Sequence, residues 1–188
     1  MLLNFNAFQI GWFACVLGGA HGWPWLGVAV TALVIAGHLY RAARPGPELA
    51  LILVSGLLGL AADSLLTGLG LLRFPSGQWH PLLAPYWMAA MWMLFATTFN
   101  VTLRWLQPRW KLAVLLGLIA GPLAYAGGAQ LGGVTFSEPS WVALLAVAGV
   151  WALALPLLLV IASRWTGPAE TVPTSAEPGR SATADRSA

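Results

Sequence analysis

Long apolar segments recur from Met1 to about Trp165, and short stretches rich in Gly and Pro separate them. A helix of about 20 residues, rising about 1.5 Å per residue, crosses the hydrocarbon core of a bilayer. The chain is 59% hydrophobic and only 8% charged, which excludes a soluble domain of this size. The sequence therefore predicts an all-α polytopic membrane protein, a bundle of six transmembrane helices at residues 3–20, 23–40, 49–72, 82–105, 112–131 and 141–163.

These spans form one transmembrane domain at residues 1–165, because no connection between them is long enough for a soluble domain. The first span is expected to be retained, since no Lys or Arg precedes it as in a cleaved leader. From residue 166 to 188 the composition changes to Pro, Ser, Thr, Ala and Gly with scattered charges. That composition predicts a disordered cytoplasmic tail.

Basic residues set the expected orientation, because cytoplasmic edges of membrane proteins carry an excess of Lys and Arg. On one side of the predicted bundle only Arg73 is basic, whereas the other side carries Arg41, Arg44, Arg104, Arg109, Lys111 and Arg164. This pattern predicts a multi-pass membrane protein with both termini in the cytoplasm. It also accounts for the net charge of +3 and excludes nucleic acid as a partner, since the bases do not gather on one face.

Asp63 is the carboxylate that lies deepest in a predicted span, and it is the main functional-site candidate. An ionised side chain at mid-bilayer costs about 2.5 to 3.5 kcal/mol, so it is expected to face protein or water. Helical spacing places it on a small and polar face with Gly56, Gly59, Thr67 and Gly70, of which Thr67 is a further candidate functional residue.

The fifth span carries a matching stripe in which Tyr125 is the large polar residue, with Gly117, Gly121, Gly128 and Gly132. Small residues allow membrane helices to approach closely. We therefore expect the two stripes to pack together and to place the Tyr125 hydroxyl near Asp63. Because a low-dielectric interior disfavours charge, Asp63 is expected to be protonated unless water or a cation reaches it.

A second polar layer is predicted near the cytoplasmic ends of the spans, with Asn4, His38 and Asn100 as its candidate functional residues. Such groups either form interhelical hydrogen bonds that hold the bundle or belong to a site, and the spacing alone leaves both interpretations open. The same two interpretations apply to Asp63.

Motifs for catalysis, cofactors and metals are absent from the sequence. Cys15 is the single cysteine, and the three histidines, His21, His38 and His80, lack the spacing of a metal site. No serine has a GxSxG context, and no glycine-rich loop precedes a Lys-Ser or Lys-Thr pair. We therefore expect no metal and no cofactor, and we favour a protein that is not an enzyme.

Four segments hold Trp, Asn, Asp and Gly residues at fixed places: Asn4-x-x-x-Phe8-Gln9-x-Gly11-Trp12-Phe13-Ala14-Cys15, Asp63-Ser64-Leu65-Leu66, Trp92-x-x-Phe95-Ala96-Thr97-Thr98-x-Asn100, and Gly121-Pro122-Leu123-Ala124-Tyr125-x-x-Gly128-x-x-Leu131-Gly132. Together they resemble a family of small bacterial inner-membrane proteins known as domain of unknown function 2878. Genes of that family often lie beside fatty-acyl cyclopropane synthase and flavin oxidoreductase genes. The resemblance implies a role in membrane-lipid modification or envelope stress, and it carries over no catalytic residue.

Three classes of function are therefore open. The leading one is an accessory component in the lipid bilayer that acts with lipid-modifying membrane partners. The second is a small-solute or proton-linked transporter or channel that uses Asp63, and the third is an intramembrane lipid-modifying enzyme that uses Asp63 and Tyr125 as acid and base. The oligomeric state and the ligand stay open.

The distribution of basic residues yields a test of topology. A reporter that is active only in the periplasm should be inactive when fused after Arg164 and active when inserted near Gly77. Activity after Arg164, or inactivity near Gly77, would contradict the predicted orientation.

Overall fold

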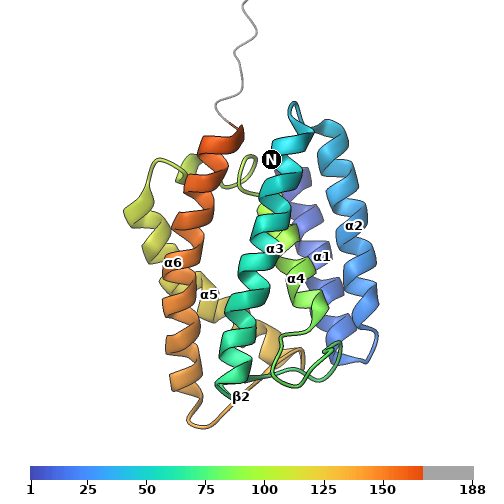
Figure 1. Ribbon diagram of the computed structural model, residues 1–188, viewed down its shortest axis with the longest axis vertical. Helices are drawn as coiled ribbons and strands as arrows, with labels where there is room; N and C mark the ends of the chain where they lie inside the picture. Colours follow the sequence, from blue (N-terminus) through green and yellow to red (C-terminus); the bar gives the residue numbers. More distant parts are fainter. Residues whose placement is uncertain (167–188) are drawn as a thin grey trace, which may run out of the picture.

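The computed structural model describes residues 1–166, and the tail predicted beyond them lies outside the described residues. These residues form six α-helices, which confirm the all-α fold; Figure 1 shows their arrangement. Their bounds are α1 (Leu2–Ala20), α2 (Pro24–Arg41), α3 (Pro45–Gly68), α4 (Tyr86–Ala96), α5 (Trp110–Gln130) and α6 (Ser140–Thr166). The smaller elements are β1 (Leu72–Arg73), the 3-10 helix η1 (Arg104–Leu106) and β2 (Thr135–Phe136).

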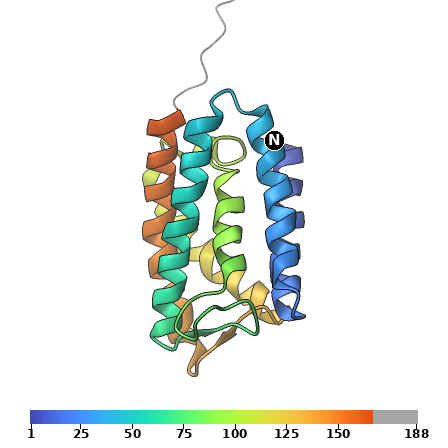
Figure 2. The ribbon, with the colours of Figure 1, turned by 45° about the vertical axis from the view of Figure 1, so that its right-hand side comes forward.

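The helices surround α4, which lies in the middle of the bundle (Figures 1 and 2). α4 packs against α1, α2 and α3; α3 also packs against α6, and α6 packs against α5. We call the end of the bundle that holds Met1 the upper end, as in Figure 1, and the end that holds β2 the lower end. The α2–α3 connection and the segment between α4 and α5 lie at the upper end.

Two short strands tie the lower end together, an element that the helical pattern did not predict. β1 follows α3 and β2 follows α5, and they pair antiparallel with Leu72 opposite Phe136. Gly70 and Gly132 lie just after the two helices with φ of 73° and 82°. L-residues with side chains rarely adopt these angles, so glycine lets the chain turn directly from each helix into its strand.

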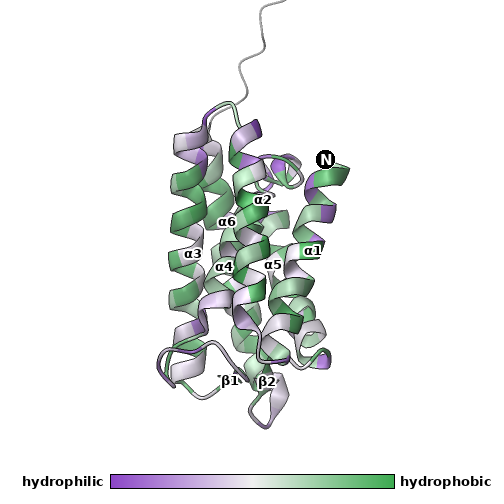
Figure 3. Cartoon of the chain, turned by 90° about the vertical axis from the view of Figure 1, so that its right-hand side faces the viewer, coloured by the Kyte–Doolittle hydropathy of each residue, from purple (hydrophilic) through white to green (hydrophobic). Residues whose placement is uncertain are grey.

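Four of the helices, α1, α3, α5 and α6, are long and apolar enough to cross a membrane. Figure 3 shows apolar residues along the middle of the bundle and polar residues gathered at its two ends. Large apolar side chains such as Leu33 and Leu153, each 74% exposed, point outward. Apolar surface of this extent marks a membrane or protein contact.

The predicted helix at residues 82–105 was wrong in length, because α4 contains only 11 residues. That length is about 16 Å, roughly half the thickness of the hydrocarbon core. Pro85 precedes the helix, and at its other end the hydroxyls of Thr97 and Thr98 donate to the carbonyls of Leu94 and Phe95 at 2.7 and 2.6 Å. These local bonds compete with continuation of the α-helix.

A short helix at this depth is tolerated only when protein surrounds it. α4 meets this condition, since Trp87, Trp92 and Leu94 are at most 2% exposed. The chain leaves α4 through consecutive turns before η1 begins at Arg104. The centre of the bundle is therefore a half-length helix held by longer neighbours.

The two glycine stripes do not pack against each other, contrary to the expectation from sequence. On α3, a Cβ at Gly56 would meet Met93 and a Cβ at Gly59 would meet Trp92, both on α4. On α5, Gly117 and Gly121 lie against Trp151 of α6. Each stripe indeed receives a close neighbour on a different helix: large side chains of α4 for the stripe on α3, and the backbone and indole of Trp151 for the stripe on α5.

Gly59 provides a test of this packing. A Cβ at this position would lie 1.9 Å from Cγ of Trp92. Because the indole is enclosed, we expect Gly59→Ala to lower the free energy of unfolding by about 1–3 kcal/mol. Thermal unfolding in detergent would measure the change.

Gly149→Ala is the matched control, since nothing lies within 4 Å of its added Cβ on the exposed side of α6. It should leave stability equal or raise it by up to about 1 kcal/mol through helix propensity. Equal melting temperatures for the two variants would contradict the described contact between α3 and α4.

Candidate functional site

The carboxyl group of Asp63 joins three helices in the core. It is fully buried, with 0% exposure. The Tyr125 hydroxyl from α5 donates to its Oδ1 at 2.5 Å, and Trp92 Nε1 from α4 donates to its Oδ2 at 2.8 Å. The structure thus brings Tyr125 to Asp63 and adds Trp92, which sequence reasoning did not include.

The two carboxyl oxygens of Asp63 accept hydrogen bonds from groups that differ in their hydrogen-bonding capacity. An indole N–H can only donate, whereas a phenol hydroxyl either donates or accepts. The triad of Asp63, Tyr125 and Trp92 can therefore hold a carboxylate with two donated bonds, or a carboxylic acid that donates to Tyr125. These two states differ by one proton, which has to come from outside the pair.

Thr67 lies beside this triad without touching the carboxyl group. Its hydroxyl donates to the backbone carbonyl of Asp63 at 2.8 Å, a bond within α3. Hydroxyls bonded to the carbonyl four residues earlier are common in helices. Its place on the face of Asp63 therefore reflects a local helical bond, and any functional role of Thr67 stays a prediction.

Tyr125 and Trp92 form part of the wall of an apolar cavity of about 280 Å³, to which α3 contributes no lining residue. The rest of the wall comes mainly from α1, α4, α5 and α6. α1 packs on α2 and α4, and α5 packs on α6, so α1 and α5 leave this space between them. The cavity is lined by aromatic and aliphatic side chains, among them Phe8, Trp12 and Met88.

Trp151 of α6 lies in the same wall and stacks on Trp92 with ring centroids 4.6 Å apart. Its Nε1 atom is buried and has no hydrogen-bond partner among residues 1–166. The Tyr125 hydroxyl is the polar group that lies beside the indole. The N–H of Trp151 is therefore enclosed by protein next to the triad and is not part of the cavity surface.

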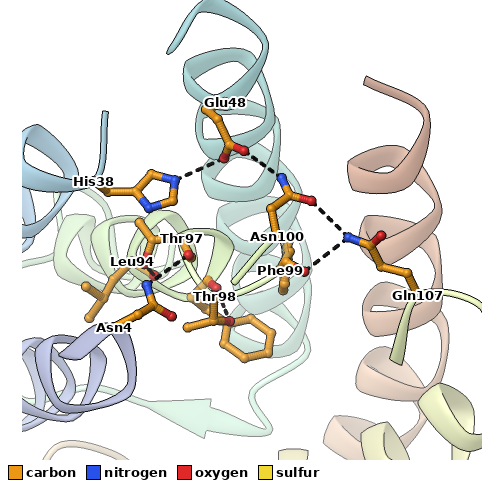
Figure 4. Close-up of polar contacts among 10 residues, drawn as sticks. Asn4, His38, Glu48, Leu94, Thr97, Thr98, Phe99, Asn100 and Gln107 are labelled. Atoms are coloured by element: carbon orange, nitrogen blue, oxygen red, sulfur yellow. Dashed lines mark hydrogen bonds and ion pairs between the residues drawn. The ribbon is translucent and has the colours of Figure 1, made fainter. Parts of the chain in front are cut away.

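A second polar cluster lies at the upper end of the bundle and is centred on Glu48 of α3, which is 7% exposed. His38 Nε2 lies 3.0 Å from Glu48 Oε2, and Asn100 Nδ2 donates to Glu48 Oε1 at 2.8 Å (Figure 4). Gln107 Nε2 donates in turn to Asn100 Oδ1 at 2.8 Å. This series of hydrogen bonds links α2 and α3 to the turns that follow α4.

Asn4 belongs to a neighbouring but separate group. Its Nδ2 donates to the carbonyl of Thr97 at 3.1 Å, and its Oδ1 accepts from the Thr102 hydroxyl at 2.7 Å. Figure 4 shows Asn4 reaching the end of α4 from α1. These hydrogen bonds pair polar backbone and side-chain groups at the end of α4. They indicate a structural role for Asn4.

Sequence reasoning grouped His38 and Asn100 in one layer but missed Glu48, which joins them. Glu48 lies in the first turn of α3, where acids are common because they complement the helix dipole. In the sequence, Glu48 therefore resembles an ordinary exposed acidic residue at the start of a helix. The structural roles of Trp92 and Trp151 were missed for another reason, since the chain has 11 Trp residues and most could be interfacial anchors.

Comparison with known proteins gives one finding. The model of the family described as protein of unknown function DUF2878 matches residues 1–157 of the chain. No curated protein and no solved structure matches. Within residues 1–166, no group of three or more His, Cys, Asp and Glu side chains is placed to hold a metal ion.

The bond between Asp63 and Tyr125 can be tested with a double-mutant cycle. Asp63→Leu leaves two buried donors without an acceptor. Each unpaired donor should lower the free energy of unfolding by about 1–3 kcal/mol. Tyr125→Phe should destabilise the wild-type protein but cost much less in the Asp63→Leu background. Unfolding in detergent provides the four stabilities.

Asp63→Asn is the matched variant, because the amide keeps an acceptor for one of the two donors. We expect it to be more stable than Asp63→Leu. An equal cost of Tyr125→Phe in both backgrounds would mean that the two side chains do not interact in the folded protein.

Proposed function

We propose that this chain, which belongs to the DUF2878 family of unknown function, is an integral membrane protein that holds the hydrocarbon chain of a membrane lipid in its cavity. In this role it serves lipid-modifying membrane partners as an accessory component. The observation that carries the proposal is the apolar space between α1 and α5.

The length of the cavity supports a lipid chain as its ligand. Its lining on α5 includes Leu116 and Gly128, which are twelve residues apart. That separation is about 18 Å along the helix, slightly more than half the ~30 Å thickness of the hydrocarbon core. A hydrocarbon chain from one leaflet therefore matches the cavity in length as well as in polarity.

The part of the cavity wall that α5 forms also opens toward the outer surface of the bundle. Ala120, Ala124 and Gly128 line the cavity at intervals of four residues, so they share one helical face. Their small side chains leave the space that larger residues would fill. Ala120 is exposed, so this face continues to the outer surface, where a lipid chain in the bilayer can enter.

The ends of the bundle suggest its place in the cell. The upper end holds six basic residues at helix ends and connections: Arg41, Arg44, Arg104, Arg109, Lys111 and Arg164. The positive-inside rule supports a cytoplasmic location for this end. Together with the family resemblance, it supports the proposal of a multi-pass protein of the bacterial inner membrane in which all six helices are embedded.

A transporter fits this geometry less well, because conduction requires a continuous polar path. On α3, Glu48 and Asp63 are separated by about 22 Å at 1.5 Å per residue. Leu51 and Ile52, both 0% exposed, lie between them together with the buried Ser55. The two polar clusters are therefore separated by tightly packed core.

A lipid-modifying enzyme is the second candidate, because Tyr125 lies in the cavity wall and is bonded to Asp63. An acid–base pair at that place would act on the held chain. Lipid profiling of a strain that lacks the gene separates the roles. The enzyme is supported if lipid chains in that strain are chemically changed and if the wild-type gene, but not the gene with Tyr125→Phe, restores them.

The proposed function predicts photolabelling inside the cavity. The protein would be reconstituted in vesicles whose phospholipid carries a diazirine in one acyl chain, and labelled residues would be identified by mass spectrometry. We expect labels at Met88 and Met91, which line the cavity, as well as at Leu153 on the outer surface.

Ala124→Phe should remove the labels at Met88 and Met91 by filling the cavity, and it should leave the Leu153 label unchanged. Gly149→Phe places the same side chain on the outer face of α6 and should not affect the cavity labels. Melting temperatures establish that both variants fold. Undiminished labels at Met88 and Met91 in a folded Ala124→Phe variant would overturn the proposal.

A further inference from the structure

The segment between α4 and α5, at the upper end of the bundle, contributes both to the cavity wall and to a charged surface (Figure 1). Leu103 and Leu106 line the cavity and are three residues apart. Three residues make one turn of a 3-10 helix, so these two side chains lie on one side of η1. Arg104 and Trp105 lie between them in the sequence and are exposed. Because neighbouring Cα atoms are about 3.8 Å apart, the charge of Arg104 is carried directly beside the apolar lining.

The start of α5 brings two further cations to the same place. Lys111 lies in the first turn of α5, five residues or about 7.5 Å before the lining residue Leu116. Arg109, the residue before this helix, donates to the backbone carbonyl of Trp105, and its guanidinium lies 5.6 Å from the centre of the Trp105 ring. Arg109 therefore joins the start of α5 to η1. We call Arg104, Arg109 and Lys111 the basic rim.

No carboxylate pairs with the basic rim within residues 1–166. The ion pair in this part of the chain joins His38 to Glu48, and Glu48 also accepts a hydrogen bond from Asn100. A guanidinium has five N–H donors, and Arg109 uses one of them for the carbonyl of Trp105. The rim therefore has uncompensated positive charge and spare donors at the upper end of the cavity.

Charge complementarity favours an anionic headgroup at this rim. A phospholipid with one chain in the cavity has its phosphate at the polar surface of the bilayer, the level at which exposed rings such as Trp105 and Trp110 usually lie. Clusters of Lys and Arg at the ends of membrane helices bind anionic lipid headgroups. A quaternary ammonium headgroup is disfavoured, since the two rings that could hold it already face Arg109 and Lys111 at 5.6 and 5.7 Å.

The lower end of the cavity offers no comparable surface. Its lining there includes Phe74 and Val134. The two connections that provide these residues, 69–85 and 131–139, hold one arginine, Arg73, and one carboxylate, Glu138. Their charges offset each other, so the attraction for a phosphate is greater at the upper end.

We propose that the ligand of the cavity is a phospholipid with a net negative headgroup, whose phosphate binds Arg104, Arg109 and Lys111 while one acyl chain lies in the cavity. The inference rests on the proposed function and adds the chemical class of the lipid and its direction. The lining residues of α5 from Leu116 to Gly128 include a series at intervals of four, so the chain runs from the rim along one helical face toward the lower end.

Photolabelling with two headgroups tests the proposal in the full-length protein. Vesicles of phosphatidylcholine would contain a small share of phosphatidylglycerol or phosphatidylcholine that carries the same diazirine-labelled acyl chain. The label at Met88 and Met91 is divided by the label at Leu153, which corrects for lipid that only surrounds the bundle. We expect this ratio to be about three- to tenfold higher for phosphatidylglycerol. The preference should shrink in about 1 M salt, where the Debye length is about 3 Å.

Matched variants test the contribution of the rim. Combined Arg104→Gln and Arg109→Gln substitutions should lower the preference to less than about twofold, whereas Lys at both positions keeps the charges and should keep most of it. Combined Arg41→Gln and Arg44→Gln substitutions remove the same charge from the α2–α3 connection at the same end of the bundle and should leave the preference unchanged. Arg73→Gln, at the lower end, should also leave it unchanged. Melting temperatures establish that each variant folds.

The outcomes separate the two proposals. If both labelled lipids reach Met88 and Met91 with equal ratios, the inference about the basic rim is wrong and the proposed function stands. A preference that persists in the folded Gln variant of Arg104 and Arg109 also overturns the inference, as does a preference that Arg73→Gln abolishes. If neither lipid labels Met88 and Met91 in the wild-type protein, the proposed function itself fails.

Discussion

The buried carboxyl group of Asp63 is the interaction on which the interior depends. α3 packs closely on α4, but α5 packs chiefly on α6, so the bond from Tyr125 is a direct link in the core between α5 and the central helices. In a low-dielectric interior such a bond is stronger than in water, and its loss leaves unpaired groups that hydrocarbon cannot satisfy. Asp63 thereby holds in place Trp92 and Tyr125, two residues of the cavity wall.

Large and small residues divide the interior into filled and open regions. Where glycine faces an indole, as Gly59 faces Trp92 and Gly121 faces Trp151, the ring takes the place of the missing side chain and the helices lock together. Where Ala120, Ala124 and Gly128 of α5 line the cavity, the aromatic residues of α1 line its other side, and the space between them stays open. The same residue types therefore serve two purposes, and the partner helix decides which.

The sequence was sufficient to predict six helices, because apolar length and Gly and Pro punctuation act locally. It also indicated that Tyr125 would approach Asp63, since helical spacing places both on small-residue faces. It failed for the pairing of those faces, because a stripe of glycine shows that something comes close without showing what. The length of α4 was missed because the hydroxyls of Thr97 and Thr98 end it through bonds that hydropathy does not register.

The brevity of α4 has a consequence for how the protein is made. A segment of 11 apolar residues is too short to partition into a bilayer as a span by itself. Membrane helices generally insert first and associate afterwards. α4 cannot follow that order, because the polar turns after it become tolerable only once Asn4 and Glu48 are there to bond them. α4 therefore enters the membrane only after α1, α2 and α3 are in place. The centre of the bundle assembles together with the helices around it.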